Sequence, residues 1–295
     1  MVTPIFGNRS LKIVDENNEN IVVVADTHIG FEQELKEKGL RLPFQTRRLA
    51  KQLTDIGRRE KADKLIILGD LKHGILGIGR EELNEVSLFL EELSKTYPQI
   101  EVIIGNHDGG LIGTLEEDNI KFHSSRGILV RESSGRVIGL FHGHAWPSPE
   151  LFKAQLLVMG HIHPSIEVAD EMGFRIVEPV WLHIPLDKKM VLQKFLRYHL
   201  KKPIYGSETD ILHVFTDVFG FTPRFHLLVV MPAFNHFLKG LAVNKYSIGE
   251  SISPILNAIG AGVLRAEVFL LDGVFLGQLK MLTTEEITVL EGIEP

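Results

Sequence analysis

No cysteine occurs anywhere in the 295 residues of this chain. Disulfide bonds are therefore excluded, and so are zinc and iron–sulfur sites built on thiolates. A bound metal ion would have to be held by imidazole, carboxylate or amide side chains. With 13 histidines, the chain has imidazole ligands in good supply.

Long apolar runs are also missing. No stretch reaches the roughly 18 residues that a membrane-spanning helix needs. The first twenty residues lack the basic segment followed by an apolar segment that is typical of a secretory signal peptide. We therefore expect a cytoplasmic protein without a membrane partner.

The chain has no excess of positive charge, since 32 Lys and Arg stand against 38 Asp and Glu, a formal net charge of −6. Proteins that coat nucleic acid are usually basic, so a broad nucleic-acid-binding face is not expected. One predicted helix carries a local basic rim, which is open to a second interpretation as an ordinary solvated helix face. The rim consists of Arg41, Arg47, Arg48, Lys51, Arg58 and Arg59.

The first half of the chain alternates strand and helix patterns. β-Branched runs predict buried strands at residues 21–24, 65–68 and 102–104. The predicted helices cover residues 31–39, 43–62 and 80–97. Such alternation indicates a largely parallel sheet with right-handed crossovers, which binds ligands at the carboxyl ends of its strands.

The second half is richer in strands. Residues 127–132 and 136–141 predict a hairpin, followed by a strand at 156–159. Residues 188–202 predict a basic, exposed helix, whereas residues 203–222 carry no readable pattern. Later strands are predicted at residues 174–177, 180–184, 227–231, 266–271 and 274–279.

Polar clusters of metal-binding type follow five of the predicted strands. In an extended loop, His161 and His163 of the last cluster would project to the same side. Imidazole mixed with carboxylate suits Mn²⁺, Fe²⁺ or Zn²⁺ better than Mg²⁺ or Ca²⁺. The clusters are Asp26 with His28, Asp70, Asn106 with His107, His142, and His161 with His163.

This ordered set resembles the signature of the calcineurin-like metallophosphoesterases, which is Asp-x-His, Gly-Asp, Gly-Asn-His-Asp, His and Gly-His-x-His. All five elements are present between Asp26 and His163. Finer marks resemble the branch of ICC-like and DNA-ligase-associated, SbcD-related phosphoesterases. These marks are Asp26–Gly30 with Glu34, Gly39 and Pro43, then Gly69–His73, Gly160–Pro164 and Val230–Asn235.

The resemblance implies an α/β fold, a four-layer αββα sandwich of two mixed sheets flanked by helices. One domain over residues 1–295 is expected. Within it, residues 1–185 would form the catalytic core, 186–226 a helical insertion, and 227–295 strands that complete the second sheet.

The resemblance also implies a binuclear metal site, with Mn²⁺ preferred and Fe²⁺ or Zn²⁺ as alternatives. The two ions would lie about 3.5–4 Å apart and activate a shared water or hydroxide for attack on phosphorus. One ion would be held by Asp26, His28, Asp70 and His163, and the other by Asp70, Asn106, His142 and His161.

His107 is expected to assist the leaving oxygen, with Asp108 orienting its ring. His142 is preferred over His144 as the ligand. His144 and His73 are candidate substrate contacts, although His73 could equally be an ordinary loop residue. Trp146 could stack on a base or pack in the core.

The predicted function is hydrolysis of phosphodiester bonds, with DNA or RNA as the substrate. A long duplex-binding surface would have to be local, or supplied by a homodimer or another partner. Two alternatives remain: an enzyme acting on small nucleotides or phosphomonoesters, and a non-catalytic scaffold of the same fold. The scaffold interpretation is disfavoured because no element of the signature is missing.

Overall fold

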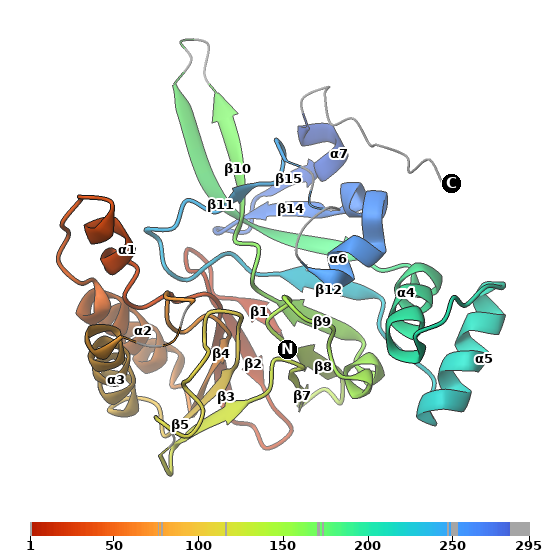
Figure 1. Ribbon diagram of the computed structural model, residues 1–295, viewed down its shortest axis with the longest axis horizontal. Helices are drawn as coiled ribbons and strands as arrows, with labels where there is room; N and C mark the ends of the chain where they lie inside the picture. Colours follow the sequence, from red (N-terminus) through yellow and green to blue (C-terminus); the bar gives the residue numbers. More distant parts are fainter. Residues whose placement is uncertain are drawn as a thin grey trace.

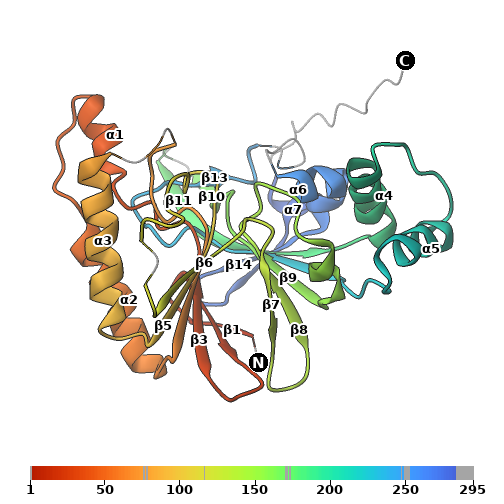
Figure 2. The same ribbon diagram turned by 60° about the horizontal axis from the view of Figure 1, so that its bottom comes forward.

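Two β-sheets lie face to face in the computed structural model, with helices on both outer sides (Figure 1). The structure describes residues 2–283 except 76, 78, 116, 170, 171, 173, 247 and 249–252. The last residues of the expected C-terminal region, 284–295, therefore lie outside the described part of the chain. Figure 2 shows the four layers side by side, which confirms the predicted sandwich.

The first sheet has the strand order β1-β2-β3-β4-β5-β6, which follows the sequence. The last four strands pair in parallel, as the strand–helix alternation predicted, while β1 and β2 pair antiparallel at one edge. The strands are β1 (Thr3–Pro4), β2 (Leu11–Val14), β3 (Asn20–Val24), β4 (Lys64–Leu68), β5 (Gln99–Ile103) and β6 (Ile120–His123).

Two long helices cover the outer face of this sheet, α2 (Thr46–Glu60) and α3 (Arg80–Ser94). Apolar residues at helical spacing on α2, Leu49, Leu53 and Ile56, are buried against the strands. The basic residues of α2 lie on the opposite, exposed side, as expected of a solvated helix face. A short helix, α1 (Glu32–Glu37), precedes α2.

The second sheet is larger and mixed, with the strand order β13-β10-β11-β12-β9-β8-β7. β9 pairs in parallel with both β8 and β12, whereas β7 and β8 form the predicted hairpin. The strands β14 and β15 extend from β11. The bounds are β7 (Ile128–Arg131), β8 (Val137–Leu140), β9 (Leu156–Met159), β10 (Pro164–Ala169), β11 (Arg175–Pro185), β12 (Leu227–Val230), β13 (Leu241–Ala242), β14 (Glu267–Leu270) and β15 (Phe275–Gln278).

Helices on the far side of the second sheet include α4 (Lys188–Leu200), which was expected to be exposed. That expectation is wrong for one face, because Val191, Leu192, Phe195 and Leu196 are buried. They pack with α5 and α6 in the core next to the second sheet. The remaining helices are η1 (Pro149–Lys153), α5 (Glu208–Phe219), α6 (Pro254–Ile259), η2 (Gly260–Arg265) and α7 (Leu279–Leu282).

Three hydrophobic cores correspond to the three interfaces between the four layers. One lies between the first sheet and α2 and α3, a second between the two sheets, and a third between the second sheet and its helices. Trp146 is partly buried and packs against the third core, with its ring centroid 5.3 Å from that of Phe195. Packing against the core, one of the two interpretations of Trp146, is therefore confirmed.

Two strands that the sequence predicted separately, residues 174–177 and 180–184, form the single strand β11. The first part of β11 pairs with β10 and the second part pairs with β12 and β14. Pro179 lies within the strand opposite Ser165. The interruption in the sequence pattern thus marks a change of pairing partner.

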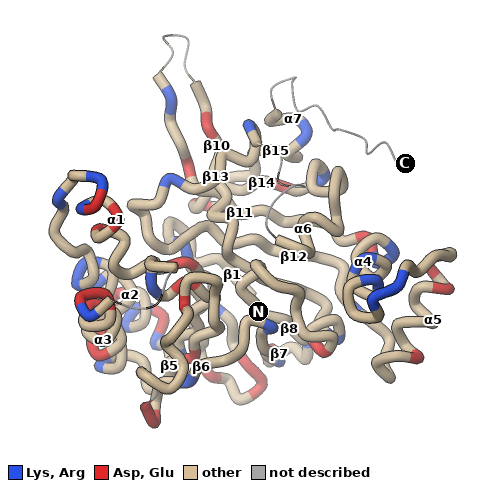
Figure 3. Tube along the Cα trace, in the orientation of Figure 1, with Lys and Arg blue, Asp and Glu red and all other residues tan. Residues whose placement is uncertain are grey.

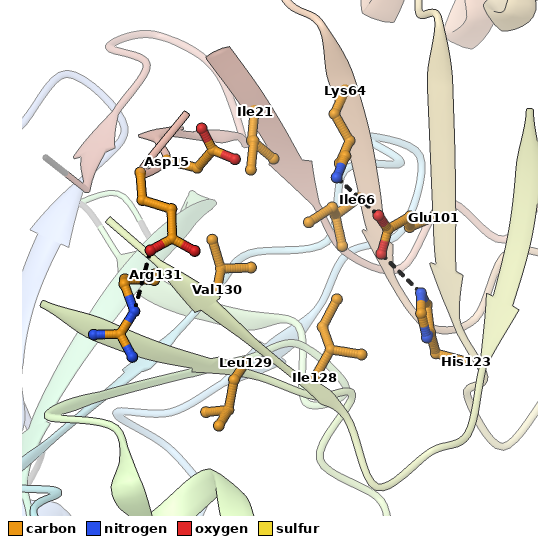
Figure 4. Close-up of a pocket in the computed structure, with 11 residues that line it drawn as sticks. Asp15, Ile21, Lys64, Ile66, Glu101, His123, Ile128, Leu129, Val130 and Arg131 are labelled. Atoms are coloured by element: carbon orange, nitrogen blue, oxygen red, sulfur yellow. Dashed lines mark hydrogen bonds and ion pairs between the residues drawn. The ribbon is translucent and has the colours of Figure 1, made fainter. Parts of the chain in front are cut away.

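A cavity of about 260 Å³ lies where β3 and β4 begin, between the first sheet and β7 (Figure 4). Glu101 of β5 lies in this cavity and bonds to both neighbouring strands. It accepts from Lys64 at 3.0 Å and contacts His123 at 2.7 Å. Three adjacent strands are thereby joined by one carboxylate.

Among the described residues, none of the helices combines the length and the apolar character that crossing a membrane requires.

Candidate metal centre

The predicted polar clusters meet at one edge of the sandwich, where both sheets contribute. Because β3, β4 and β5 are parallel, their carboxyl ends lie together, and β8 and β9 of the second sheet end beside them. The first sheet brings Asp26, His28, Asp70, Asn106 and His107, and the second brings His142, His144, His161 and His163.

Asp26, His28 and His163 form a first group whose ligand atoms all lie within 4.8 Å of one another. The Nε2 atoms of His28 and His163 are 3.3 Å apart, and His163 Nε2 lies 3.5 Å from Asp26 Oδ1. The Asp26 carboxylate also accepts from the backbone nitrogen of His161 at 2.9 Å.

Asp70, His142 and His161 form a second group, equally compact. His142 Nε2 lies 3.4 Å from Asp70 Oδ2 and 3.1 Å from Asn106 Oδ1. The other ring nitrogen of His142, Nδ1, contacts the carbonyl oxygen of Leu68 at 2.8 Å. This contact assigns the ring proton to Nδ1 and leaves Nε2 free to face the group.

Asp70 lies between the two groups. Its Oδ2 atom is 3.6 Å from His28 Nε2 on one side and 3.4 Å from His142 Nε2 on the other. A single carboxylate is thus within reach of both clusters of ligand atoms.

The backbone at these positions takes left-handed conformations. Of the eight non-glycine residues with positive φ in the described ranges, five are candidate ligands: Asp26, His28, Asp70, His161 and His163, with φ between 43° and 75°. Such conformations are costly and cluster at functional sites. His161 and His163 therefore do not project to one side of an extended loop, as the sequence suggested; the left-handed turn sends them to different groups.

Comparison with known proteins identifies the family. The sequence profile of the calcineurin-like phosphoesterases matches residues 19–186, which is more than half of the chain. The chain belongs to the calcineurin-like phosphoesterases. No curated protein matches it.

Three solved structures are similar in fold, all at low identity. The Pseudomonas putida nuclease MPE is 16% identical, with 92% of this chain and 98% of that chain covered and a TM-score of 0.46. The E. coli phosphoesterase YfcE is 19% identical, with coverages of 51% and 73% and a TM-score of 0.34. Vps29 from Entamoeba histolytica, complexed with Zn²⁺, is 15% identical, with coverages of 53% and 71% and a TM-score of 0.23.

The electrostatics of this phosphoesterase site favour bound cations. Burial lowers the pKa of His142, but the hydrogen bond and charge of Asp70, with the charge of Asp26, outweigh it and raise the pKa to about 9. Burial acts to raise the pKa of Asp70, yet His142 and His28 hold it well below its usual range. The carboxylates that attract a proton to His142 would equally attract a divalent ion.

The residues present fit divalent metal ions. His161 Nε2 is buried and has no hydrogen-bond partner among the described residues, as expected of an atom reserved for an ion. Burial and the neighbouring His142 lower the pKa of His161 to about 3, so its imidazole is in the neutral form that ligates metals. Carboxylate, imidazole and the Asn106 amide form a donor set typical of borderline divalent ions.

His107 lies beside the two groups, with Nε2 3.9 Å from Asp70 Oδ2. Its Nδ1 bonds to the carbonyl oxygen of His73, so Nε2 is the nitrogen left for a substrate. The expectation that Asp108 holds this ring is wrong. The Asp108 carboxylate instead accepts from the backbone nitrogens of Gly105 at 2.7 Å and Lys72 at 3.1 Å. A buried carboxylate needs hydrogen-bond donors, and the backbones of these two loops supply them.

His144 lies behind the second group, its ring centroid 5.1 Å from that of His142. Burial and the charge of His142 lower the pKa of His144 to about 4. His144 belongs to none of the compact groups of potential ligands, which favours His142 as the ligand. His73 lies on the other side, and both of its ring nitrogens contact protein groups.

Sequence reasoning missed the residues that hold the loop after β4. The fully buried Lys72 bonds to the carbonyl oxygens of Gly74 and, at 2.8 Å, Gly77. Glu82 of α3 accepts from the backbone nitrogens of His73 and Gly74 at 3.2 and 2.6 Å. A buried glutamate within a helix pattern carries no local signal of this role.

Proposed function

We propose that this phosphoesterase is a binuclear-metal phosphodiesterase that cleaves nucleic acid chains. The observation that carries the proposal is the position of Asp70, which is shared between two compact ligand groups beside His107. The proposed ligands are Asp26, His28, Asp70 and His163 for one ion, and Asp70, Asn106, His142 and His161 for the other.

Bound divalent ions, with Mn²⁺ proposed, supply positive charge to the phosphoryl oxygens and lower the pKa of a water nucleophile. The protein's own residues orient the reaction. We propose that His107 acts as an imidazolium: its Nδ1–H donates to the His73 carbonyl oxygen, and its Nε2–H gives the proton to the leaving oxygen, which leaves a neutral ring. An alkoxide is a poor leaving group, so cleavage of a sugar–phosphate chain depends on this proton.

We propose a single-stranded substrate rather than a long duplex. The side chains of His107 and His163 are 17% and 20% exposed, so a phosphate of a polymer can reach them from solvent. The basic residues of this side lie mainly on α2 and the acidic ones mainly on α3, so no basic strip runs across both helices (Figure 3). Few phosphates of a bound nucleic acid would then be neutralised. A short flexible segment depends less on such neutralisation than a long duplex does.

The test compares wild type with His107→Ala on Mn²⁺-supplemented single-stranded and duplex oligonucleotides and on bis(p-nitrophenyl) phosphate. Loss of the proton donor should reduce oligonucleotide cleavage by about 10²–10⁴-fold. Nitrophenolate leaves without a proton, so hydrolysis of the small diester should fall much less. Metal content should be unchanged.

His213→Ala, on the exposed side of α5, is the matched control and should behave as wild type. Cleavage of the small diester but of no oligonucleotide by wild type would contradict the nucleic-acid proposal and indicate a nucleotide-sized substrate. Loss of both metals in His107→Ala would show that His107 is a ligand.

A further inference from the structure

His73 connects a residue outside the metal centre to a proposed ligand inside it. Its Nε2 bonds to the Glu34 carboxylate of α1. Its Nδ1 faces Nδ1 of His28 at a distance of 3.2 Å. The opposite nitrogen of His28, Nε2, faces Asp70 and His163.

The positions of the hydrogens along this chain follow from the donors and acceptors. An ionised carboxylate only accepts, so the hydrogen of a neutral His73 ring must lie on Nε2, and Nδ1 is then an acceptor. Two ring nitrogens in contact need one hydrogen between them, which His28 Nδ1 must supply. His28 Nε2 is consequently left with a lone pair directed at the metal site.

We propose that Glu34 is a positioning residue: acting through His73, it selects the tautomer and the ring orientation of His28 that suit metal binding. The inference rests on the proposed function in taking His28 as a ligand. Ring nitrogens that donate to a carboxylate or carbonyl are a general means of orienting metal-ligating histidines. Here the acceptor is a second histidine, and the carboxylate lies one step further out.

The surroundings of His73 support this role. Its backbone nitrogen has acceptors in Ile29 at 3.1 Å and Glu82 at 3.2 Å, so the main chain is held on two sides. Its carbonyl oxygen accepts from His107 Nδ1. One residue thus orients a proposed ligand through its side chain and the proposed proton donor through its backbone.

Glu34 is itself held by Lys38, one helical turn later. Hydrogen bonds from Lys38 and then His73 lower the pKa of Glu34 to about 2, so it is ionised under ordinary conditions. The Lys38 contact lies on the outer side of the carboxylate and does not reach the histidines. Replacing Lys38 therefore changes the surface of α1 without changing the contacts that connect Glu34, His73 and His28.

The experiment observes ring tautomers directly, using ¹⁵N NMR of the histidines in metal-free protein. Wild type should show His28 with its hydrogen on Nδ1 and His73 with its hydrogen on Nε2. Glu34→Ala should shift both rings toward mixed tautomers. Glu34→Gln should largely preserve the wild-type pattern, because the amide oxygen still accepts from Nε2, and Lys38→Ala should preserve it fully.

The same proteins are then titrated with Mn²⁺ while free ion is followed by electron paramagnetic resonance. We expect two ions per chain, with the affinity of one reduced about 10–100-fold in Glu34→Ala and close to wild type in Glu34→Gln and Lys38→Ala. Unchanged tautomers or unchanged affinity in Glu34→Ala would overturn the inference. A third ion per chain would also overturn the inference, because His28, His73 and His107 would then hold a metal ion in place of the hydrogen bond between His28 and His73.

Failure of the proposed function has a different signature. If wild type hydrolyses no phosphoester while the His28 tautomer still depends on Glu34, the catalytic proposal fails and the positioning role stands. If hydrolysis is intact and the tautomers of His28 and His73 are the same in Glu34→Ala as in wild type, only the positioning role fails.

Discussion

At the scale of single residues, the site depends on two glycines at which any Cβ atom would overlap a candidate metal ligand. Gly105 lies directly before Asn106, and a Cβ atom there would overlap the Oδ1 and backbone nitrogen atoms of Asp70. Gly160 is similar, since a Cβ atom would lie 2.6 Å from Asp26 Oδ2. Because glycine has no side chain, the ends of neighbouring strands can approach closely enough for their candidate ligand atoms to lie next to one another.

Gly105→Ala should therefore displace Asp70. We expect a loss of about 1–3 kcal/mol in the free energy of unfolding, as for other overpacked sites, and a large loss of metal affinity. Urea unfolding and Mn²⁺ titration measure the two effects. Gly109→Ala is the control in the same loop, because nothing lies within 4 Å of its Cβ position. Equal behaviour of the two variants would show that the close approach is unimportant.

At the scale of elements, the parallel strands β4, β5 and β6 are joined through Glu101, as Figure 4 shows. The hydrogen bond with His123, aided by Lys64, lowers the pKa of Glu101 from 4.5 to about 2. Because the folded-state pKa is depressed, this carboxylate stabilises the fold above about pH 4.5. That contribution is lost as the pH falls toward 2.

Glu101→Gln should destabilise the protein by about 1–3 kcal/mol near pH 7, since it removes the carboxylate that pairs with Lys64 and contacts His123. The difference from wild type should hold between pH 7 and 5 and shrink near pH 3. Urea unfolding at several pH values measures it. Lys121→Gln, an exposed neighbour on β6, should match wild type throughout. A difference for Glu101→Gln that grows in acid would reverse the assigned sign.

At the scale of the whole molecule, the site joins the two sheets. Asp26, His28 and Asp70 come from the first sheet, and His142, His161 and His163 from the second. Ions held between them would resist separation of the sheets, so metal binding and folding should be coupled.

Mn²⁺ added to metal-free wild type should therefore raise the melting temperature. At about 100 times the Kd, one site contributes about 2.7 kcal/mol. Asp70→Ala should remove the shared carboxylate and abolish the binding of two ions together, so that added Mn²⁺ gives little or no shift. Calorimetry with metal analysis measures both. Two ions still bound to Asp70→Ala at normal occupancy would rule out the bridging role.

Much of the fold could be predicted from the sequence, because local pattern and backbone chemistry were sufficient. The β-branched runs of β3 and β4, the helical spacing on α2, and the proline after α3 are local signals. The polar residues at strand ends predicted a metal site for the same reason: parallel strands present their carboxyl ends together. The family followed from the order of those residues, which the profile match confirmed.

Other features were decided only by the tertiary structure, because they depend on contacts between distant segments. The burial of one face of α4 requires α5 and α6, and the continuity of β11 requires a change of partner at its middle. The acceptors of Asp108 and the partners of His73 lie on other loops and on α1, so no local pattern indicates them. Sequence determined which residues form the candidate site; tertiary packing decided which atoms face one another within it.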